Sequence, residues 1–218
     1  MIDKNIEKKI TDYARSQFTV DATGHDWGHV ERVCIMARYL GEREHADQDI
    51  VVISALLHDI GLSDEIKLGI DHSDRSANMA ESYLRSIDFE KNKIEGIVEA
   101  IRCHRYGKRL IPQTIEGKIL QDADRLDAIG AIGIARAFAY GGARGAPIYD
   151  AEEKVENYDP FMVKSTITHF QEKLLKIKDS LHTSSAKEIG ERRHQFMLYF
   201  IDEFYKEINF YTCTKNDD

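Results

Sequence analysis

Apolar positions recur at intervals of three and four residues along most of the chain, which is the spacing of one face of an α-helix. One such stripe runs over residues 2–18. A second runs over residues 30–40 and follows Asp26, a residue type that caps helix N-termini. Residues 47–57 are apolar on nearly every side and predict a central buried helix. Because no run of alternating β-branched residues is long enough for a core strand, the pattern predicts an all-α fold.

The pattern changes in the last third of the chain. Residues 115–140 contain many small side chains, which let neighbouring helices approach closely. The glycines and the proline of GGARGAP, residues 141–147, then predict a loop that continues as far as Pro160. Beyond it the spacing predicts two long amphipathic helices, the first over residues 167–181 and the second starting at a capping box of Ser185 and Glu188.

The length of the chain favours a single domain, since 218 residues bury one substantial core. We expect a helical core over residues 1–140, a glycine-containing loop over residues 141–160, and C-terminal helices over residues 161–218 that pack on the core. The apolar faces of these last helices are also suited to packing on a second subunit, so a homodimer stays open as an alternative.

Composition narrows the class of partner and the compartment. The formal net charge of −8 argues against bulk binding of nucleic acid, but a small anionic ligand needs only a local positive pocket. The three cysteines show no C-x-x-C spacing, and a sparse, odd number suits a reducing compartment. The N-terminus has no apolar signal core, and the longest aliphatic stretch, residues 50–57, is too short to span a bilayer. We therefore expect a cytoplasmic protein that is not held in a membrane.

A histidine–aspartate pair ends the most apolar predicted helix. Burying the carboxylate of Asp59 beside the imidazole of His58 is costly unless both are paired or bound to a cation. His29 on the preceding helix and Asp124 on a later one complete a candidate ligand shell, with Asp122 as the alternative if the helix register is shifted. Two imidazoles and two carboxylates without a thiolate suit Mn, Mg, Fe, Co or Ni, and also admit Zn. Water would fill the remaining positions of such a site.

The order of these residues carries a resemblance to a known family. The motif H-D-W-x-H-x-x-R-V, then the His-Asp pair, then D-A-D-R-L-D resembles the HD superfamily of metal-dependent phosphohydrolases over residues 24–129. The later segments FAYGG, HFQEKLLKIKDSLHT and RRHQFM resemble its small stand-alone bacterial branch. The resemblance implies an HD-domain helical bundle with two additional C-terminal amphipathic helices. It matches four residues to the metal ligands of the family: His29, His58, Asp59 and Asp124.

Two further histidines fall where family members with a second metal place extra ligands. These are His72 and His104, and if both bind an ion, Asp59 bridges the two. A role in orienting ligands or in contacting phosphate is an equal alternative for each, and one ion is the default expectation. Asp26 and Asp127 are expected to orient ligands or neighbouring arginines.

Cations near the ligands are candidates for holding phosphate oxygens. Arg32 and Arg125 each lie within one turn of a proposed ligand. We take Asp59, His104 and Arg125 as the catalytic candidates. Four residues are candidates for binding phosphate: Arg32, Lys67, Arg105 and Arg144, the last on the glycine-containing loop.

Other polar residues are given less weight. Lys173 and Lys176, on a predicted amphipathic helix, are candidates for facing the site, but lysines on such a helix ordinarily face solvent, and solvent is the default expectation for both. Asp64 and Glu65 follow the His-Asp pair closely and are open candidates for accepting a proton, because spacing alone does not fix their direction.

The leading hypothesis for function is hydrolysis of a phosphate ester or anhydride by a metal-activated water, with a nucleotide as the small phosphorylated substrate. Some members of the resembling branch hydrolyse nucleoside triphosphates to monophosphate and pyrophosphate, which favours pyrophosphohydrolysis of a (deoxy)nucleoside triphosphate. A nucleotide monophosphatase or phosphodiesterase, a non-catalytic nucleotide-binding module and a di-iron oxygenase are the alternatives, because the same metal-binding fold serves each.

Overall fold

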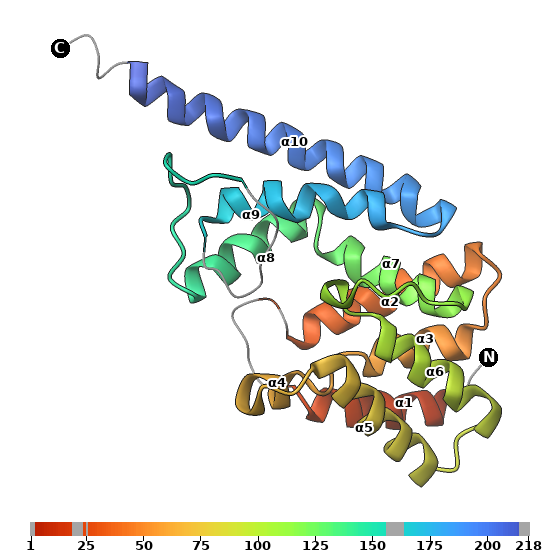
Figure 1. The fold of residues 1–218 in the computed structure, drawn as a ribbon. Helices are drawn as coiled ribbons and strands as arrows, with labels where there is room; N and C mark the ends of the chain where they lie inside the picture. Colours follow the sequence, from red (N-terminus) through yellow and green to blue (C-terminus); the bar gives the residue numbers. More distant parts are fainter. Residues whose placement is uncertain (1–2, 19–23, 25, 156–163, 214–218) are drawn as a thin grey trace.

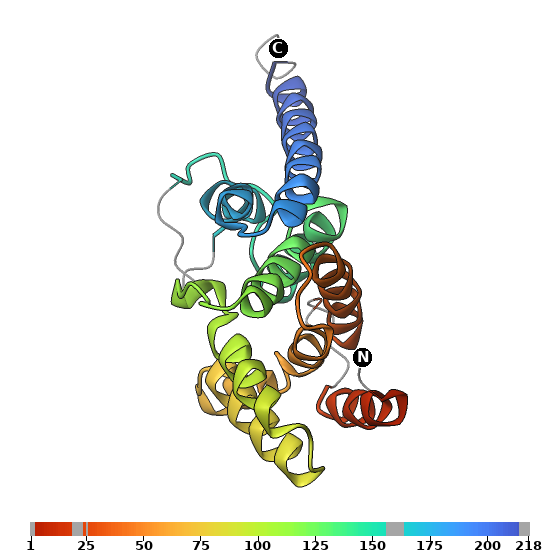
Figure 2. The same cartoon turned by 90° about the vertical axis from the view of Figure 1, so that its right-hand side faces the viewer.

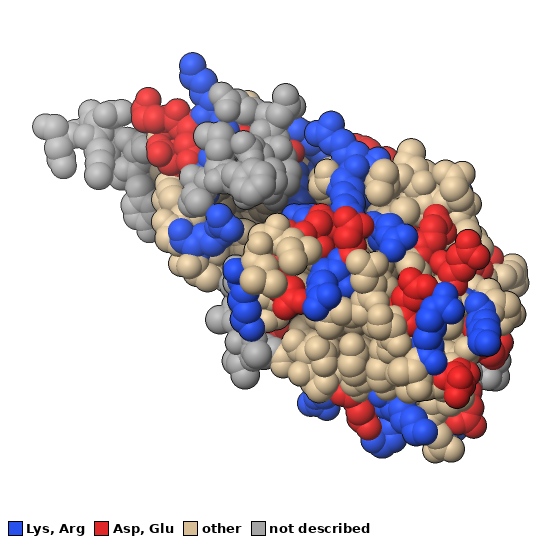
Figure 3. All heavy atoms as spheres, turned by 60° about the horizontal axis from the view of Figure 1, so that its bottom comes forward, with Lys and Arg blue, Asp and Glu red and all other residues tan. Residues whose placement is uncertain are grey.

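The computed structural model describes residues 3–18, 24, 26–155 and 164–213. The described residues form helices and connecting segments and contain no strand, which confirms the predicted all-α class (Figure 1). No helix in this part of the chain combines the length and the hydropathy that crossing a bilayer requires. On the face that Figure 3 shows, acidic and basic side chains are interspersed.

The first part of the chain is a bundle around one central helix. Its elements are α1 (Lys4–Ser16), α2 (Trp27–Arg43), α3 (Gln48–Leu57), α4 (Leu62–Leu68), α5 (His72–Ser86), α6 (Lys91–Cys103), the 3₁₀ turn η1 (Tyr106–Lys108) and α7 (Ile115–Asp127). Helix α3 contacts α1, α2, α5, α6 and α7. All its residues except Gln48 and Ile50 are buried, which confirms the predicted central helix.

Helix α2 begins where the sequence predicts. Asp26 is its N-cap, and the Asp26 carboxylate accepts a hydrogen bond from the backbone N–H of His29 at 3.1 Å. This bond satisfies one of the N–H groups that a helix leaves unpaired in its first turn. The cap therefore also fixes the backbone of the residue that carries the first candidate metal ligand.

The segment rich in small residues is divided between two helices. Helix α7 ends at Asp127, and α8 (Gly130–Ala143) starts at a glycine with φ of +80°. A side chain at Gly130 would be strained at this φ and would meet the side chain of Arg193. Helix α8 also runs into the predicted glycine-containing loop as far as Ala143, so the non-helical part starts later than expected. Glycine at the end of a helix therefore did not stop it here.

The first predicted C-terminal helix is interrupted. It consists of α9 (Thr166–Glu172) and the 3₁₀ helix η2 (Leu174–Ser180), separated by Lys173 with φ −130° and ψ −60°. The expectation of one continuous helix over residues 167–181 was wrong. The apolar stripe of this segment is nevertheless buried throughout, at Ile167, Phe170, Leu174, Ile177 and Leu181. The spacing of the apolar residues predicts that they are buried together, and they stay buried although the helix type changes.

The last helix, α10 (Ser184–Cys213), has a different cap from the one predicted. Thr183 Oγ1 accepts the hydrogen bond from Ala186 N at 3.3 Å, whereas Ser185 lies inside the helix and its N–H donates to Glu44 at 2.9 Å. The cap of this helix is therefore Thr183, two residues before the Ser185 of the predicted capping box. The hydroxyl of Thr183 also donates to Asp122 at 2.7 Å, which holds the cap against α7.

Helix α10 connects the bundle of α1 to α7 with the C-terminal segment. It contacts α7, α8, η2 and α2, and its C-terminal part extends past the rest of the molecule in both ribbon views (Figures 1 and 2). The turn before it is anchored by Asp122, whose carboxylate also accepts hydrogen bonds from the backbone N–H groups of His182 and Thr183, both at 2.8 Å. The bundle and the C-terminal segment thus share a buried polar connection.

We expect replacement of Asp122 by alanine to lower the free energy of unfolding by about 3 kcal/mol, because buried N–H and hydroxyl donors lose their acceptor. Urea denaturation followed by circular dichroism measures this. Asp202→Ala on an exposed part of α10 is the control and is expected to change stability by less than about 0.5 kcal/mol. Equal stability of the two variants would show that the anchor is not energetically important.

Candidate metal centre

Three helices and the segment after α3 bring four predicted ligands together. His29 lies in the first turn of α2, His58 is the C-cap of α3 and Asp59 follows it, and Asp124 lies on α7. The Nε2 atom of His29 is 3.7 Å from Asp59 Oδ2 and 3.4 Å from Asp124 Oδ1, and the Nε2 atom of His58 is 3.4 Å from Asp59 Oδ2. The alternative ligand Asp122 points instead to the turn before α10. One group of donor atoms therefore faces a common point.

A second group lies on the other side of Asp59. Its Oδ1 atom is 3.3 Å from Nε2 of His104, the C-cap of α6, and 3.5 Å from Nε2 of His72, the first residue of α5. This oxygen is buried and has no hydrogen-bond partner among the described residues. The donor atoms of His29, His58 and Asp59 lie within 4.8 Å of one another, and so do those of Asp59, His72 and His104. A metal ion spans this spacing.

All four imidazoles are held by their other nitrogen. Each Nδ1 atom contacts an oxygen, which directs Nε2 toward Asp59: His29 contacts Asp127 at 2.7 Å, His58 the carbonyl of Ala55 at 2.8 Å, His72 the carboxylate of Glu65 at 2.5 Å, and His104 the carbonyl of Ile101 at 2.6 Å. A neutral imidazole that donates through Nδ1–H has an unprotonated Nε2, which is the form that binds a metal. The 3.3 Å separation of the Nε2 atoms of His29 and His58 fits two ligands of one cation.

Two of these supports come from helix ends. His58 and His104 are both C-cap residues, and each ring contacts the carbonyl three residues earlier in its own helix. The last carbonyls of a helix have no intrahelical N–H partner, so they are available to orient a side chain. The same local geometry therefore places one ligand in each of the two groups.

Charge at the centre is unbalanced without a cation. Burial raises the pKa of the Asp59 carboxyl, but the surrounding histidines outweigh it and hold this pKa well below its usual range. Burial likewise disfavours the charged form of His58, yet Asp59 and Asp124 raise its pKa to about 9. In His104 burial prevails and lowers the pKa, so this ring is neutral at neutral pH. The carboxylates are ionised, as metal ligands must be.

The carboxylate of Asp127 contacts the candidate ligand His29 and also binds two arginines. Its carboxylate contacts His29 and accepts hydrogen bonds from Nε of Arg32 at 2.7 Å and from Nη1 of Arg136 at 2.7 Å. Burial opposes ionisation of Asp127, but these neighbours lower its pKa. This arrangement matches the orienting role expected for Asp127. Arg136, on α8, was not anticipated, because nothing in its sequence spacing distinguishes it from a surface arginine.

The four predicted phosphate-binding cations have different partners and different exposure. Arg105 donates to Glu65 at 2.7 Å, next to His72, and Arg32 is engaged with Asp127 as described. Lys67 is exposed on α4, and Arg144 is exposed after α8, where it donates to the hydroxyl of Tyr140 at 2.9 Å. Phosphate binding by all four stays a prediction.

The predicted catalytic residue Arg125 is turned toward the C-terminal segment. It donates from Nη1 to the carbonyl of Ser180 at 2.6 Å and contacts His182 at 3.1 Å, while its guanidinium lies 5.6 Å from the ring centre of Tyr106. Glu65, an open candidate for accepting a proton, contacts His72 Nδ1, and Asp64 accepts from Arg75 at 2.6 Å. The structure therefore gives Glu65 an orienting position beside the second group.

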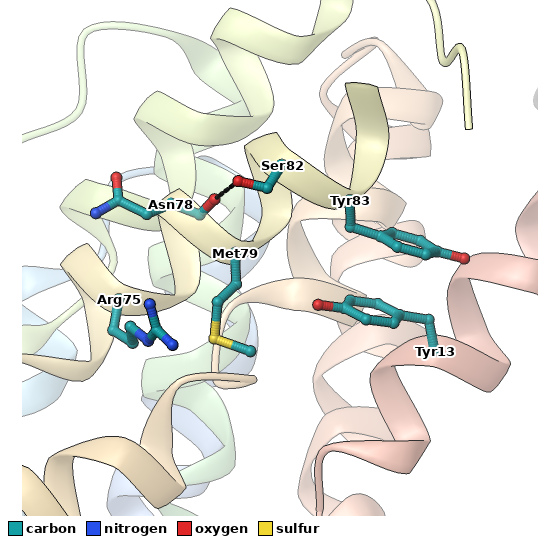
Figure 4. A pocket seen from close by; sticks show the side chains of 6 residues that line it. All are labelled: Tyr13, Arg75, Asn78, Met79, Ser82 and Tyr83. Carbon is teal, nitrogen blue, oxygen red and sulfur yellow. Dashed lines mark hydrogen bonds between the residues drawn. The ribbon is translucent and has the colours of Figure 1, made fainter. Parts of the chain in front are cut away.

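A separate pocket lies away from these ligands, between α1 and α5. It encloses about 440 Å³ and is lined by Tyr13, Arg75, Asn78, Met79, Ser82 and Tyr83 (Figure 4). The rings of Tyr13 and Tyr83 stack at 3.7 Å with an interplanar angle of 5°. None of the proposed metal ligands lines this pocket, so it is not the opening of the metal centre.

Comparison with known proteins decides the family. A model of the HD domain matches residues 26–129, the span that contains all six candidate ligands. The Bacillus subtilis protein YpgQ, which is uncharacterized, is 38% identical over 210 residues, covering 92% of this chain and 93% of YpgQ. The chain belongs to the HD superfamily. Divalent metal binding is a property of HD domains, and the His/Asp cluster of this chain is suited to it.

The similarity to solved structures extends over nearly the whole of this chain. A Lactobacillus plantarum structure is 31% identical with a TM-score of 0.80, covering 96% of this chain and 99% of that one. YpgQ in complex with ADP is 36% identical with a TM-score of 0.74, covering 93% and 95%. An HD-superfamily hydrolase from Bacillus thuringiensis is 37% identical with a TM-score of 0.73, covering 94% and 98%. The C-terminal helices thus belong to the shared fold.

We expect Asp127→Asn to weaken Mn²⁺ binding by about 10- to 100-fold, because the carboxylate that orients His29 and balances two arginines loses its charge. Isothermal titration calorimetry of the metal-free protein measures the affinity. Asp202→Asn, at an exposed position of α10, is the control and is expected to bind Mn²⁺ as the wild type does. Unchanged affinity in the Asp127 variant would contradict the orienting role.

Metal binding is expected to tighten with rising pH. In the metal-free protein His58 has a pKa of about 9, so at neutral pH its proton must leave before Nε2 binds an ion. Below this pKa each unit of pH then raises the affinity about tenfold for the release of one proton. Anaerobic Mn²⁺ titrations at pH 7 and pH 8 test this, and equal affinities at the two values would exclude a proton-linked ligand.

Proposed function

We propose that this protein is a metal-dependent phosphohydrolase that acts on nucleotides. The observation that carries the proposal is the position of Asp59: its two buried carboxylate oxygens each face two histidine Nε2 atoms at 3.3–3.7 Å. Carboxylate oxygens and imidazole Nε2 atoms that converge at this spacing are a donor set suited to a divalent cation. The description of a similar Bacillus thuringiensis protein as an HD-superfamily hydrolase supports the reaction class.

The donor set suits a divalent cation of intermediate hardness. His29, His58, Asp59 and Asp124 are the residues that would hold the first ion, through two imidazoles and two carboxylates. This mixture favours Mn, Fe, Co, Ni or Mg, with Zn also accommodated, and the absence of thiolate argues against a closed structural zinc site. Such an ion lowers the pKa of a coordinated water and neutralises phosphate charge.

A second ion has its own candidate ligands. Asp59, His72 and His104 form the second group, and Glu65 orients His72 from the other side of its ring. The unpartnered Oδ1 atom of Asp59 favours this two-ion form, because an ion between the groups of ligands satisfies an oxygen that is otherwise left without a hydrogen bond. Asp59, which belongs to both groups of donors, would then help to hold both ions.

The protein residues have separable tasks in this proposal. The imidazoles are held in place by Asp127, Glu65 and two helix-end carbonyls, so little reorganisation accompanies ion binding. Asp124 has 24% of its side chain exposed, whereas the other three members of its group are buried, so solvent and substrate reach the centre on this side. Basic side chains at the rim, Arg105 among them, neutralise phosphate oxygens.

The substrate class rests on two supports. YpgQ, 36% identical, has been solved in complex with ADP, which is consistent with a nucleotide ligand for this chain. The resemblance of the C-terminal segments to a branch with nucleoside triphosphate pyrophosphohydrolases favours release of pyrophosphate over release of phosphate. We therefore propose a (deoxy)nucleoside triphosphate as substrate and the monophosphate and pyrophosphate as products.

We expect the Mn²⁺-loaded protein to release pyrophosphate from a panel of (deoxy)nucleoside triphosphates, with activity lost in EDTA and restored by Mn²⁺. Asp59→Ala is expected to lower kcat/KM by about 10³-fold, equivalent to roughly 4 kcal/mol of transition-state stabilisation. Ion chromatography distinguishes pyrophosphate from phosphate.

Two results would contradict parts of this proposal. Release of phosphate alone would make the protein a phosphatase, and full activity of Asp59→Ala would exclude metal catalysis at this centre. Metal analysis of His72→Ala separates one ion from two, since a fall from two bound Mn²⁺ per chain to one is expected only if the second group binds.

A further inference from the structure

Lys173 lies where the C-terminal segment changes its helix type. The sequence predicts that it faces solvent on a continuous amphipathic helix. In the structure its backbone departs from helical geometry, with φ −130° and ψ −60°, and it serves both as the C-cap of α9 and as the residue before η2. The side chain is not exposed, whereas Lys176, three residues later, is. The break therefore distinguishes two lysines that the sequence pattern treats alike.

The ammonium group of Lys173 reaches the region next to the metal centre. It lies 5.5 Å from the ring centre of Tyr106, which is two residues after the candidate ligand His104. The guanidinium of Arg125, one residue after Asp124, lies 5.6 Å from the same ring. Cation–aromatic contacts of this length hold a positive group in place. Tyr106 thus positions a cation from the C-terminal segment beside residues of the HD domain.

One carboxylate and two guanidinium groups act electrostatically on the ammonium group of Lys173. Burial lowers its pKa, attraction by Asp124 raises it, and repulsion by Arg136 and Arg105 lowers it further. Lys173, Arg136 on α8 and Arg105 after α6 thus bring positive charge from three elements toward Asp124, the candidate ligand with an exposed edge. Two of these cations also have carboxylate partners, Arg136 with Asp127 and Arg105 with Glu65. Positive charge gathered near an opening attracts a polyanion such as a chain of phosphates.

We propose that Lys173 binds the phosphate chain of the substrate at the exposed edge of Asp124, so that a residue outside the HD-matched span contributes directly to the site. The ligand class is a di- or triphosphate, as in a nucleotide. The ammonium group supplies N–H donors on a flexible stem and suits an oxygen of a phosphate chain. This inference rests on the proposed function for the identity of its ligand, but its test does not require turnover.

The test compares three variants of the Mn²⁺-loaded protein: Lys173→Met, Lys173→Arg and the exposed control Lys176→Met. Binding of inorganic pyrophosphate is measured by calorimetry. We expect Lys173→Met to weaken it by about 10- to 100-fold, the range for loss of one charge-assisted hydrogen bond, while Lys173→Arg recovers part of the affinity. Lys176→Met is expected to match the wild type.

Two further measurements separate binding from a structural role. Mn²⁺ affinity and thermal midpoint are expected to stay close to wild type in Lys173→Arg, which keeps the cation beside Tyr106. In turnover assays with a deoxynucleoside triphosphate, Lys173→Met is expected to raise KM by about tenfold or more. If Lys173→Met and Lys176→Met bind pyrophosphate equally well, the proposal is wrong.

Failure of this inference is distinguishable from failure of the proposed function. Wild-type turnover together with unchanged pyrophosphate binding in Lys173→Met would leave the hydrolase intact and remove Lys173 from the site. Absence of turnover of any nucleotide, together with weakened pyrophosphate binding in Lys173→Met alone, would overturn the proposed reaction and support the phosphate site.

Discussion

The carboxylate of Asp59 is the constraint on which the rest of the structure depends. Only 6% of this residue is exposed, and an ionised carboxylate at such a depth costs several kcal/mol unless charges or a cation compensate it. The compensation comes from imidazoles on or at the ends of α2, α3, α5 and α6. Packing of these helices on the apolar surface of α3 is therefore what allows the charged centre to exist.

The four imidazoles are oriented by two kinds of contact. Two use carbonyls at the ends of their own helices, and two use the carboxylates of Asp127 and Glu65. In the first case the local geometry of a C-cap is sufficient. In the second, the orienting residue comes from another helix, so the ligand is in place only when the helices have docked. Folding and assembly of the candidate metal centre are thereby linked.

The C-terminal segment belongs to the same polar system. Asp122 on α7 anchors the turn before α10, and Arg125, one turn later on the same helix, donates to the carbonyl at the end of η2. Between these two residues lies Asp124, which faces the metal centre. Helix α7 therefore presents a candidate metal ligand on one face and anchors for the C-terminal helices on another. The placement of Lys173 beside Tyr106 follows from this connection.

The sequence alone determined the helical class, the buried α3, the cap at Asp26 and the ligand candidates that meet around Asp59, because apolar spacing and motif order are local properties of the chain. It did not determine the break at Lys173 or the cap at Thr183. Both lie where the C-terminal segment meets distant parts of the chain: Thr183 donates to Asp122, and the ammonium group of Lys173 lies over the ring of Tyr106. Tertiary structure also decided which arginines approach the centre, since helical spacing gives the direction of a side chain but not what stands opposite it.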